Sequence, residues 1–138
     1  MKYFILIFCV ILAFASCDSS KGVIKKDTPI AEGDTLRIAN DSLEYEILII
    51  EPGFYSWLST QRPRGYYGQD FLERKNQQFV LEYNRRVMNW QQYDPNIYQQ
   101  EINYEYNIDY GYEVNYLLYN YFIYFIQEYN QRFPGARG

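Results

Sequence analysis

The segment from Tyr116 to Phe125 restricts the possible folds of this chain most, because a helix built from it has no polar face. Its ten residues, YLLYNYFIYF, include one strongly polar side chain, that of Asn120. A helix that is apolar all round is normally buried in a domain or shared with a partner. Asn115, Asn120 and the polar residues at both ends argue against a membrane span. We therefore expect a helix that is covered on every side.

This helix is expected to begin at about Tyr110, with Asp109 as its cap, and to run to Arg132, before Pro134-Gly135. Tyrosine is abundant in and around it, since 11 of the 17 tyrosines of the chain fall between Tyr93 and Tyr129. A tyrosine ring can pack against apolar neighbours while its hydroxyl stays in water. The tyrosines are therefore expected to serve as core or as interface.

A second long helix of about 20 residues is expected to start near Asp70. Asp70 and Glu73 resemble a capping box, with Asp in place of Ser or Thr. Ion pairs at i,i+4, Asp70–Arg74 and Glu82–Arg86, are expected on its outer face. Apolar side chains recur at three and four residues on the opposite face: Leu72, Phe79, Tyr83, Val87 and Trp90.

Two strands precede these helices, separated by a turn at residues 40–42. Residues 36–39 form the first strand, and the alternation of residues 42–50 is typical of a second strand, with its end buried on both faces. A short helix is expected at residues 54–58. Residues 97–110 alternate as well, and this pattern leaves both an edge strand and a loop open. The expected fold is α+β, a small antiparallel sheet of two to three strands packed by two long helices.

The N-terminus has the pattern of an export signal at residues 1–16. Lys2 precedes an apolar run of about a dozen residues, which is too short to span a bilayer comfortably. The residues Phe14-Ala15-Ser16-Cys17 resemble the lipobox of bacterial lipoproteins. This resemblance implies cleavage before Cys17 and attachment of a lipid to its thiol. Cys9 leaves with the signal, so the processed chain has no second cysteine for a disulfide.

The processed chain is then expected to be a lipid-anchored protein of the cell envelope. Residues 17–35 are predicted to be a flexible tether, followed by one domain at residues 36–133 and a tail at residues 134–138. Loss of Lys2 leaves 12 basic and 17 acidic residues, a net charge of −5. That charge argues against general nucleic-acid binding, so the membrane, a protein partner or a second copy are the expected contacts.

No catalytic residue, cofactor or metal is expected. The chain has no histidine, the commonest general base and the commonest transition-metal ligand. Glu44 and Glu46 could form a carboxylate pair on one strand face, but an exposed acidic face explains them better. Asp94 and Asn96 are explained as turn formers around Pro95, and no calcium loop is present.

Two candidate binding surfaces remain. Residues 62–68, RPRGYYG, combine cations with aromatic rings and glycines, and Arg62, Arg64, Tyr66 and Tyr67 could bind a glycan or an anionic head group. A structured connection whose arginines pair with acids is the favoured interpretation of this segment. The candidate surface for a protein partner lies on the last helix, at Tyr116, Tyr119 and Tyr124.

Several short motifs taken together resemble an uncharacterised family of small Bacteroidota lipoproteins. They include Pro52-Gly53-Phe54 with Trp57-Leu58, Pro63-Arg64-Gly65-Tyr66, and residues 109–116, DYGYEVNY. The resemblance covers about residues 36–133 and implies export and lipidation, but no activity. The expected function is therefore a structural or protein-interaction role at the envelope, with a glycan-binding or cell-wall-binding module as the alternative.

Overall fold

The computed structural model describes residues 33–136. The predicted signal, Cys17 and residues 17–32 of the predicted tether lie outside this part of the chain. The described elements follow the order β1 (Thr35–Asn40), η1 (Asp41–Leu43), β2 (Tyr45–Ile50), α2 (Phe54–Leu58), α3 (Gln69–Met88) and α4 (Tyr112–Glu128). A two-stranded antiparallel sheet and two long helices confirm the predicted α+β class.

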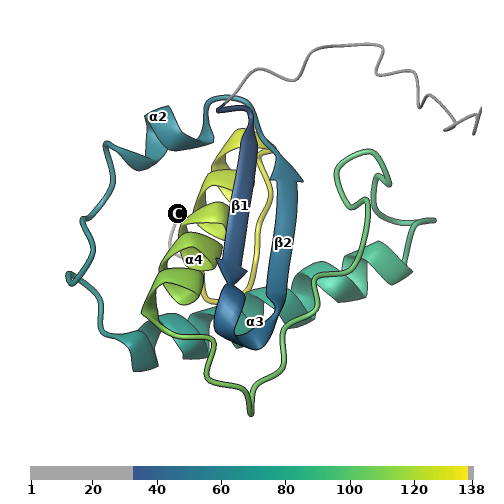
Figure 1. Ribbon diagram of the computed structural model, residues 1–138. Coiled ribbons are helices and arrows are strands. Elements are labelled where there is room, and N and C mark those ends of the chain that lie inside the picture. The colour runs from purple at the N-terminus through teal and green to yellow at the C-terminus, as the bar shows by residue number, and fades with distance from the viewer. Residues whose placement is uncertain (1–32, 137–138) are drawn as a thin grey trace, which may run out of the picture.

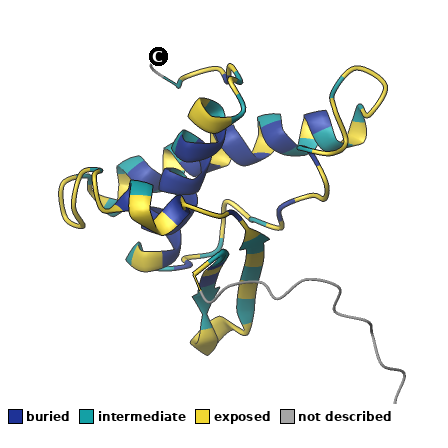
Figure 2. Ribbon diagram, turned by 90° about the horizontal axis from the view of Figure 1, so that it is seen from above, coloured by how far each residue is buried: buried dark blue, intermediate teal, exposed yellow. Residues whose placement is uncertain are grey.

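The sheet buries one face and exposes the other. Leu36 and Ile38 of β1 are fully buried, and they lie opposite Ile49 and Ile47 of β2 in the antiparallel register. On the outward face, by contrast, Leu48 is 53% exposed and Ile50 is 59% exposed. The prediction that β2 ends buried on both faces is therefore wrong. Figure 2 shows the strands projecting from the helices, so that no described element lies over this face.

Helix α4 occupies the centre of the domain. It packs against α3, β1 and α2, and Figure 1 shows it behind the sheet. Ten of its residues are buried, which confirms a helix covered on every side. It is shorter than expected, because it begins after Gly111, whose φ of 83° favours glycine. Asp109 accepts a hydrogen bond from the main-chain N–H of Gly111, and so fixes the turn before the helix rather than capping it.

Helix α3 has the expected amphipathic pattern, with Leu72, Phe79 and Tyr83 buried. The predicted capping box is wrong, because α3 begins after Gly68 and Asp70 lies exposed in the first turn. The Glu82–Arg86 ion pair is present, but Arg86 is buried rather than on the outer face.

Residues 89–111 form a long irregular connection, so the loop alternative holds for residues 97–110. Side chains replace the hydrogen bonds that a strand partner would make. The Asn84 side chain both accepts from the N–H of Ile102 and donates to its carbonyl oxygen, each at 2.8 Å. The main-chain N–H of Glu105 donates to the Tyr110 hydroxyl at 3.0 Å.

The packed region extends slightly beyond the predicted domain at both ends. Thr35 already belongs to β1, and Lys75 Nζ donates to the carbonyl oxygen of Gly135 at 2.9 Å. Ala136 packs against the core. Between residues 33 and 136, none of the helices is long and apolar enough to cross a membrane.

Candidate functional site

Three large apolar side chains stand out from the surface beside one hollow. Leu81 is 74% exposed, Met88 is 67% exposed and Tyr106 is 81% exposed. They border a groove of about 1040 Å³, here called the α3 groove. It is formed by the outer face of α3 (Gln77, Gln78, Val80, Leu81, Glu82, Asn84, Arg85 and Met88), the loop Tyr104, Glu105, Tyr106 and Asn107, and the C-terminal Pro134 and Gly135.

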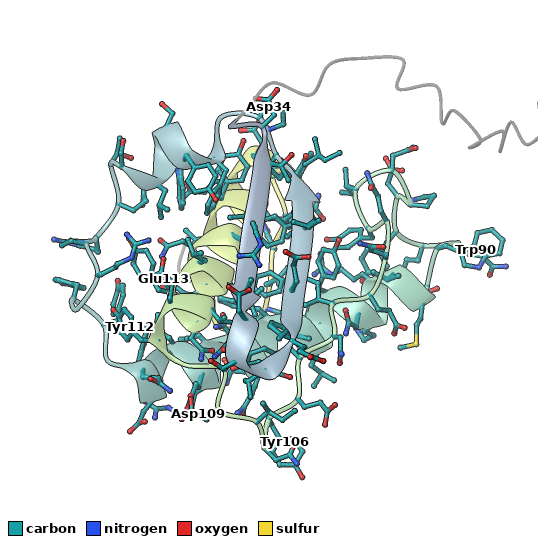
Figure 3. The ribbon with its side chains drawn as sticks, viewed as in Figure 1. Asp34, Trp90, Tyr106, Asp109, Tyr112 and Glu113 are labelled. Atoms are coloured by element: carbon teal, nitrogen blue, oxygen red, sulfur yellow. The ribbon has the colours of Figure 1, made fainter. Side chains whose placement is uncertain are left out.

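The loop side of the groove is fixed by contacts with the core. The Tyr104 hydroxyl donates to Asn115 Oδ1 of α4 at 2.7 Å. The N–H of Glu105 is held by Tyr110, as described above. Tyr106 directly follows these two fixed residues and begins a turn at residues 106–107. Figure 3 shows it at the outermost point of the loop. The ring is therefore displayed at a defined place beside α3.

The C-terminal side of the groove is fixed as well. Lys75 binds the Gly135 carbonyl oxygen. Gly135 has a φ of 78° and lies so close to α3 that a Cβ built on it would be 2.9 Å from Gln78 Oε1. The backbone conformation therefore favours glycine at this position, whereas the contact with the end of the flexible Gln78 side chain is relieved by a small shift of that amide.

Apolar side chains and amides are the main groups that the groove offers to a ligand. Its ionic groups are largely paired with one another. Glu82 accepts from both Arg85 and Arg86, and these hydrogen bonds, from Arg85 foremost, lower the pKa of Glu82 to about 2. The side-chain amides of Gln77, Gln78 and Asn107 line the groove, and within residues 33–136 they have no hydrogen-bond partner in the protein. They are free to donate and to accept toward a ligand.

The predicted surface at residues 62–67 is brought together, mainly by internal contacts. Arg64 Nε donates to Glu113 Oε2 at 2.7 Å, and its guanidinium lies 4.5 Å from the centre of the Tyr116 ring. This arrangement supports the favoured interpretation of a structured connection. Of the four predicted residues, Arg64 alone lines the smaller hollow of about 380 Å³ next to Tyr55.

The other three residues of that segment are partly occupied by neighbours. The Arg62 guanidinium covers the Tyr66 ring at 4.6 Å. Tyr67 stacks on Phe71 with 4.7 Å between ring centres. The loop is further held by Tyr112, whose hydroxyl accepts from the N–H of Gly65 at 2.6 Å and donates to the Tyr67 carbonyl oxygen at 3.0 Å.

The prediction that tyrosines of α4 form an exposed surface for a protein partner is wrong. Tyr116 is 3% exposed and Tyr124 is 6% exposed, while Tyr119 is half-buried. The Tyr116 hydroxyl donates to the Arg62 carbonyl oxygen at 3.1 Å, and that of Tyr124 to the Pro52 carbonyl oxygen at 3.0 Å. The chain before and after α2 therefore covers these rings within the same domain.

The α3 groove was not among the surfaces predicted from the sequence. Leu81 and Met88 are seven residues apart, so two helical turns place them on the same face of α3. The other exposed residues of that face are polar. Two apolar residues at this spacing were therefore the sequence signal that pointed to the groove. Tyr106 carried no signal of its own among the neighbouring tyrosines.

The acidic and amide residues considered for catalysis or metal binding have structural roles in the described part of the chain. Glu46 binds Arg37, whereas Glu44 has a φ of 52° and precedes β2, so the two do not form a pair on one strand face. Asp94 accepts from the N–H of Asn96 at 2.9 Å, which is the predicted turn. Within residues 33–136 no group of three or more Asp, Glu, Cys or His side chains could hold a metal ion.

A family model described as a family of unknown function, DUF6146, matches residues 3–136. The match spans nearly the whole chain and confirms the resemblance to an uncharacterised family. No curated protein and no solved structure matches the chain.

Proposed function

Because the chain belongs to the DUF6146 family, whose function is unknown, we propose its function from its own residues: a lipid-anchored protein of the cell envelope that binds another protein through the α3 groove. The single observation that carries the binding role is the placement of Leu81, Met88 and Tyr106. Each is more than two-thirds exposed, and all three border the same groove.

Exposure of large apolar side chains to water is unfavourable, and a bound partner would remove them from water. Covering a large apolar side chain contributes about 1.5–3 kcal/mol, at about 25 cal/mol per Å². Single exposed apolar residues are ordinary, whereas exposed apolar residues gathered into one patch mark sites of interaction. Methionine also adapts its shape to irregular partners, which suits Met88 to a contact surface.

The chemistry of the groove fits an apolar peptide segment of a protein. Apolar side chains of such a segment would contact Leu81, Met88 and Tyr106. The amides of Gln77 and Gln78 would donate to and accept from its main chain. Because Glu82 and Arg85 are bound to each other, Glu105 supplies the remaining charge of the groove lining, which suits a largely uncharged ligand.

The anchoring part of the proposal is supported by the sequence around Cys17. Two or three acyl chains on one cysteine hold a protein at a membrane far more firmly than a single chain does. Asp34, close to the start of the described residues, lies at the opposite end of the molecule from Tyr106 in Figure 3. A domain attached through its N-terminal end would thus present the loop side of the groove away from the anchor.

Glycan binding at residues 62–67 has less support in the geometry. The face of Tyr66 is covered by Arg62, and Tyr67 is stacked on Phe71. Arg64, the residue best placed to bind an anion, is already bound to Glu113. The protein-interaction role is therefore the proposal we favour.

The partner role is tested by site-specific photo-crosslinking in intact cells, with the crosslinking amino acid at position 77 beside the groove. We expect one defined crosslinked protein, joined through an apolar segment, and loss of that product in Leu81→Asp and Tyr106→Ser variants. Leu48→Asp is the matched control, because it places the same charge on an exposed leucine of the sheet. An unchanged product in all variants, or a product of twice the chain's mass, contradicts a separate partner at this groove.

Anchoring is tested independently with Cys17→Ser. The variant is expected to move from the membrane fraction to the soluble fraction of the envelope and to lose metabolic labelling with a fatty acid. A Cys9→Ser variant serves as the control, since that cysteine belongs to the predicted signal. Persistence of Cys17→Ser in the membrane fraction contradicts a lipid anchor at this residue.

A further inference from the structure

The main-chain groups along the outer edge of β2 point away from β1. The N–H of Glu51 donates to the carbonyl oxygen of Asp34 at 2.8 Å, so these two residues form a hydrogen-bonded pair of the antiparallel hairpin. Such pairs alternate with pairs whose members make no hydrogen bond to each other. In the observed register Glu46, Leu48 and Ile50 belong to pairs of the second kind. Their N–H and C=O groups are therefore directed to the far side of β2.

These main-chain groups have no partner in the described part of the chain. The sheet has two strands, and within residues 33–136 neither the N–H nor the C=O of Glu46, Leu48 or Ile50 makes a hydrogen bond. Figure 2 shows the two strands projecting from the helices. A row of unpaired N–H and C=O groups at the edge of a sheet is a template for a further strand.

The side chains of β2 do not block such pairing. Natural edge strands commonly carry a lysine, a proline or a bulge that prevents the addition of another strand. Residues 47–50 are all apolar, ILII, and the register with β1 is continuous along the whole strand. Leu48 and Ile50 are more than half exposed, and Ile47 and Ile49 are half-buried. The edge is therefore open to a strand with apolar side chains.

The edge is complementary to a second copy of itself. If two β2 strands run antiparallel with Leu48 opposite the second copy's Leu48, Glu46 of each copy lies opposite Ile50 of the other. All three free residues then form hydrogen-bonded pairs, with two bonds in each pair. A shift by two residues keeps only two such pairs, because Pro52 has no N–H to donate and Glu44, with a φ of 52°, lies outside β2. The arrangement centred on Leu48 therefore makes the most hydrogen bonds.

The charges and the remaining side chains fit the same arrangement. Glu46 is the one charged residue of β2, and it is bound to Arg37 of its own chain. In the centred register the two copies of Glu46 lie four residues apart along the strands, about 13 Å at about 3.3 Å per residue, so no acid opposes an acid. Ile47 of one copy lies opposite Ile49 of the other, which makes an apolar cross-strand pair.

We propose that two copies of the chain pair through β2, antiparallel and centred on Leu48, so that their two hairpins form one four-stranded sheet. Each copy contributes the same surface, as in most two-fold symmetric dimers. A sheet of three or more strands is also more stable than a two-stranded one. Pairing along one short strand is a small contact, so the dimer is expected to exchange with the monomer.

The proposed dimer goes beyond the proposed function, because no residue of β2 lines the α3 groove. Each dimer would hold two grooves, one on each copy. A variant of Leu48 that separates the copies leaves the residues of the groove unchanged, so it still serves as the control for binding at the groove.

Thiol crosslinking tests the pairing in the full-length chain expressed in cells. The Cα atoms of a hydrogen-bonded antiparallel pair lie about 5.5 Å apart, which is within the range that a disulfide bridges. We expect Leu48→Cys to give a dimer linked between the two positions 48 under mild oxidation, identified from the linked peptides. Leu81→Cys is the matched control, because Leu81 is also an exposed leucine but lies on α3. Equal dimer yields in both variants, no dimer through position 48, or a link from position 48 to another protein overturns the proposal.

Hydrogen exchange in the purified chain tests the main-chain pairing without new cysteines. We expect the amides of Leu48 and Ile50 to exchange roughly tenfold more slowly at about 1 mM than at about 1 μM protein, a range that covers weak dimers, while the amides of α3 keep their rates. The variant Leu48→Asp should abolish this concentration dependence at Ile50, and Leu81→Asp should keep it. Exchange at Leu48 and Ile50 that is independent of concentration, whether fast or slow, overturns the pairing of two copies.

Both experiments measure β2 directly. Neither depends on lipidation or on a partner at the α3 groove, so failure here leaves the proposed function to its own tests.

Discussion

Glu82 and Arg86 lie one turn apart on α3, and Arg86 Nε donates to Glu82 Oε1 at 2.7 Å although Arg86 is only 8% exposed. The same guanidinium donates to the Tyr98 hydroxyl at 2.8 Å and lies 4.5 Å from the centre of the Phe133 ring. It also donates to the carbonyl oxygen of Arg132. One buried cation thus joins α3 to the long connection and to the C-terminal segment.

We therefore expect Arg86→Met to lower the free energy of unfolding by about 3 kcal/mol, because it leaves several buried acceptors without their donor. Arg85→Met is the matched control, since Arg85 also binds Glu82 but lies exposed. Its effect should be much smaller. Urea denaturation followed by circular dichroism measures both, with the slope of the transition unchanged. Equal destabilisation by the two variants contradicts a structural role specific to Arg86.

A buried amide pair joins the two long helices. Asn76 Nδ2 of α3 donates to both the carbonyl oxygen and Oδ1 of Asn115 on α4, each at 3.0 Å. The Tyr104 hydroxyl donates to the same Oδ1. Asn115→Ala removes the two bonds to Oδ1 and keeps the bond to the carbonyl oxygen, and it is expected to cost about 3 kcal/mol, because the buried Asn76 amide and the part-buried Tyr104 hydroxyl lose an acceptor. This network also fixes the loop that carries Tyr106.

The control for this prediction lies on the same helix. Asn120 is also buried, but its amide donates only to the Tyr116 carbonyl oxygen one turn earlier. Asn120→Ala should therefore cost about 1 kcal/mol in the same denaturation assay. A larger loss in Asn120→Ala than in Asn115→Ala would show that the interhelical network does not dominate.

Periodic patterns predicted the elements that are defined by their own residues. The alternation of residues 42–50 and the three-to-four spacing in α3 are local. Helix α3 forms where expected, and the strand forms over Tyr45–Ile50, later than predicted because Asp41–Leu43 belong to the turn η1. The path of residues 97–110 depends instead on Asn84, which lies 18 residues before Ile102 and takes the place of a strand partner. No pattern within the segment itself contains that information.

The candidate site was harder to predict than the fold, because it too depends on contacts between residues that are distant in the sequence. Burial of Tyr116 and Tyr124 is decided by the carbonyl oxygens of Arg62 and Pro52, more than 50 residues away in the chain. Aromatic richness in a helix is compatible with core and with interface, and only the three-dimensional contacts separate them. Conversely, Leu81 interrupts a polar face of α3 in the sequence, and the three-dimensional contacts show that it borders the groove.

The hydroxyl of Tyr112 makes two of the hydrogen bonds that hold the loop at residues 62–68. Tyr112 accepts from the N–H of Gly65 and donates to the Tyr67 carbonyl oxygen. Tyr112→Phe should increase the hydrogen-exchange rate of the Gly65 amide roughly fivefold, for the loss of about 1 kcal/mol. Tyr66→Phe, with no described hydrogen bond through its hydroxyl, should leave that rate unchanged. A normal rate in Tyr112→Phe shows that other contacts hold the loop.

Glu51 gives the chain a pH dependence that opposes that of Glu82. Glu51 is 6% exposed, and this burial raises the pKa of its carboxyl group, although the Tyr129 hydroxyl donates to it at 3.0 Å and partly offsets the shift. A carboxyl whose pKa is higher in the folded state contributes its stability below the unfolded value, and loses it as the pH rises through the folded value. Glu82, with a pKa of about 2, behaves in the opposite way and loses its contribution only in acid.

Glu51→Gln separates the two effects, because glutamine resembles the protonated acid and can still accept from Tyr129. We expect the variant to melt at a higher temperature than the unchanged chain at pH 7, and the difference to vanish below about pH 4, where Glu51 is protonated in the folded and unfolded states. Glu44→Gln is the matched control, because it makes the same substitution at an exposed position. Thermal melts followed by circular dichroism from pH 3 to pH 8 measure this. A lower melting temperature for Glu51→Gln at pH 7 would mean that the ionised carboxylate stabilises the fold.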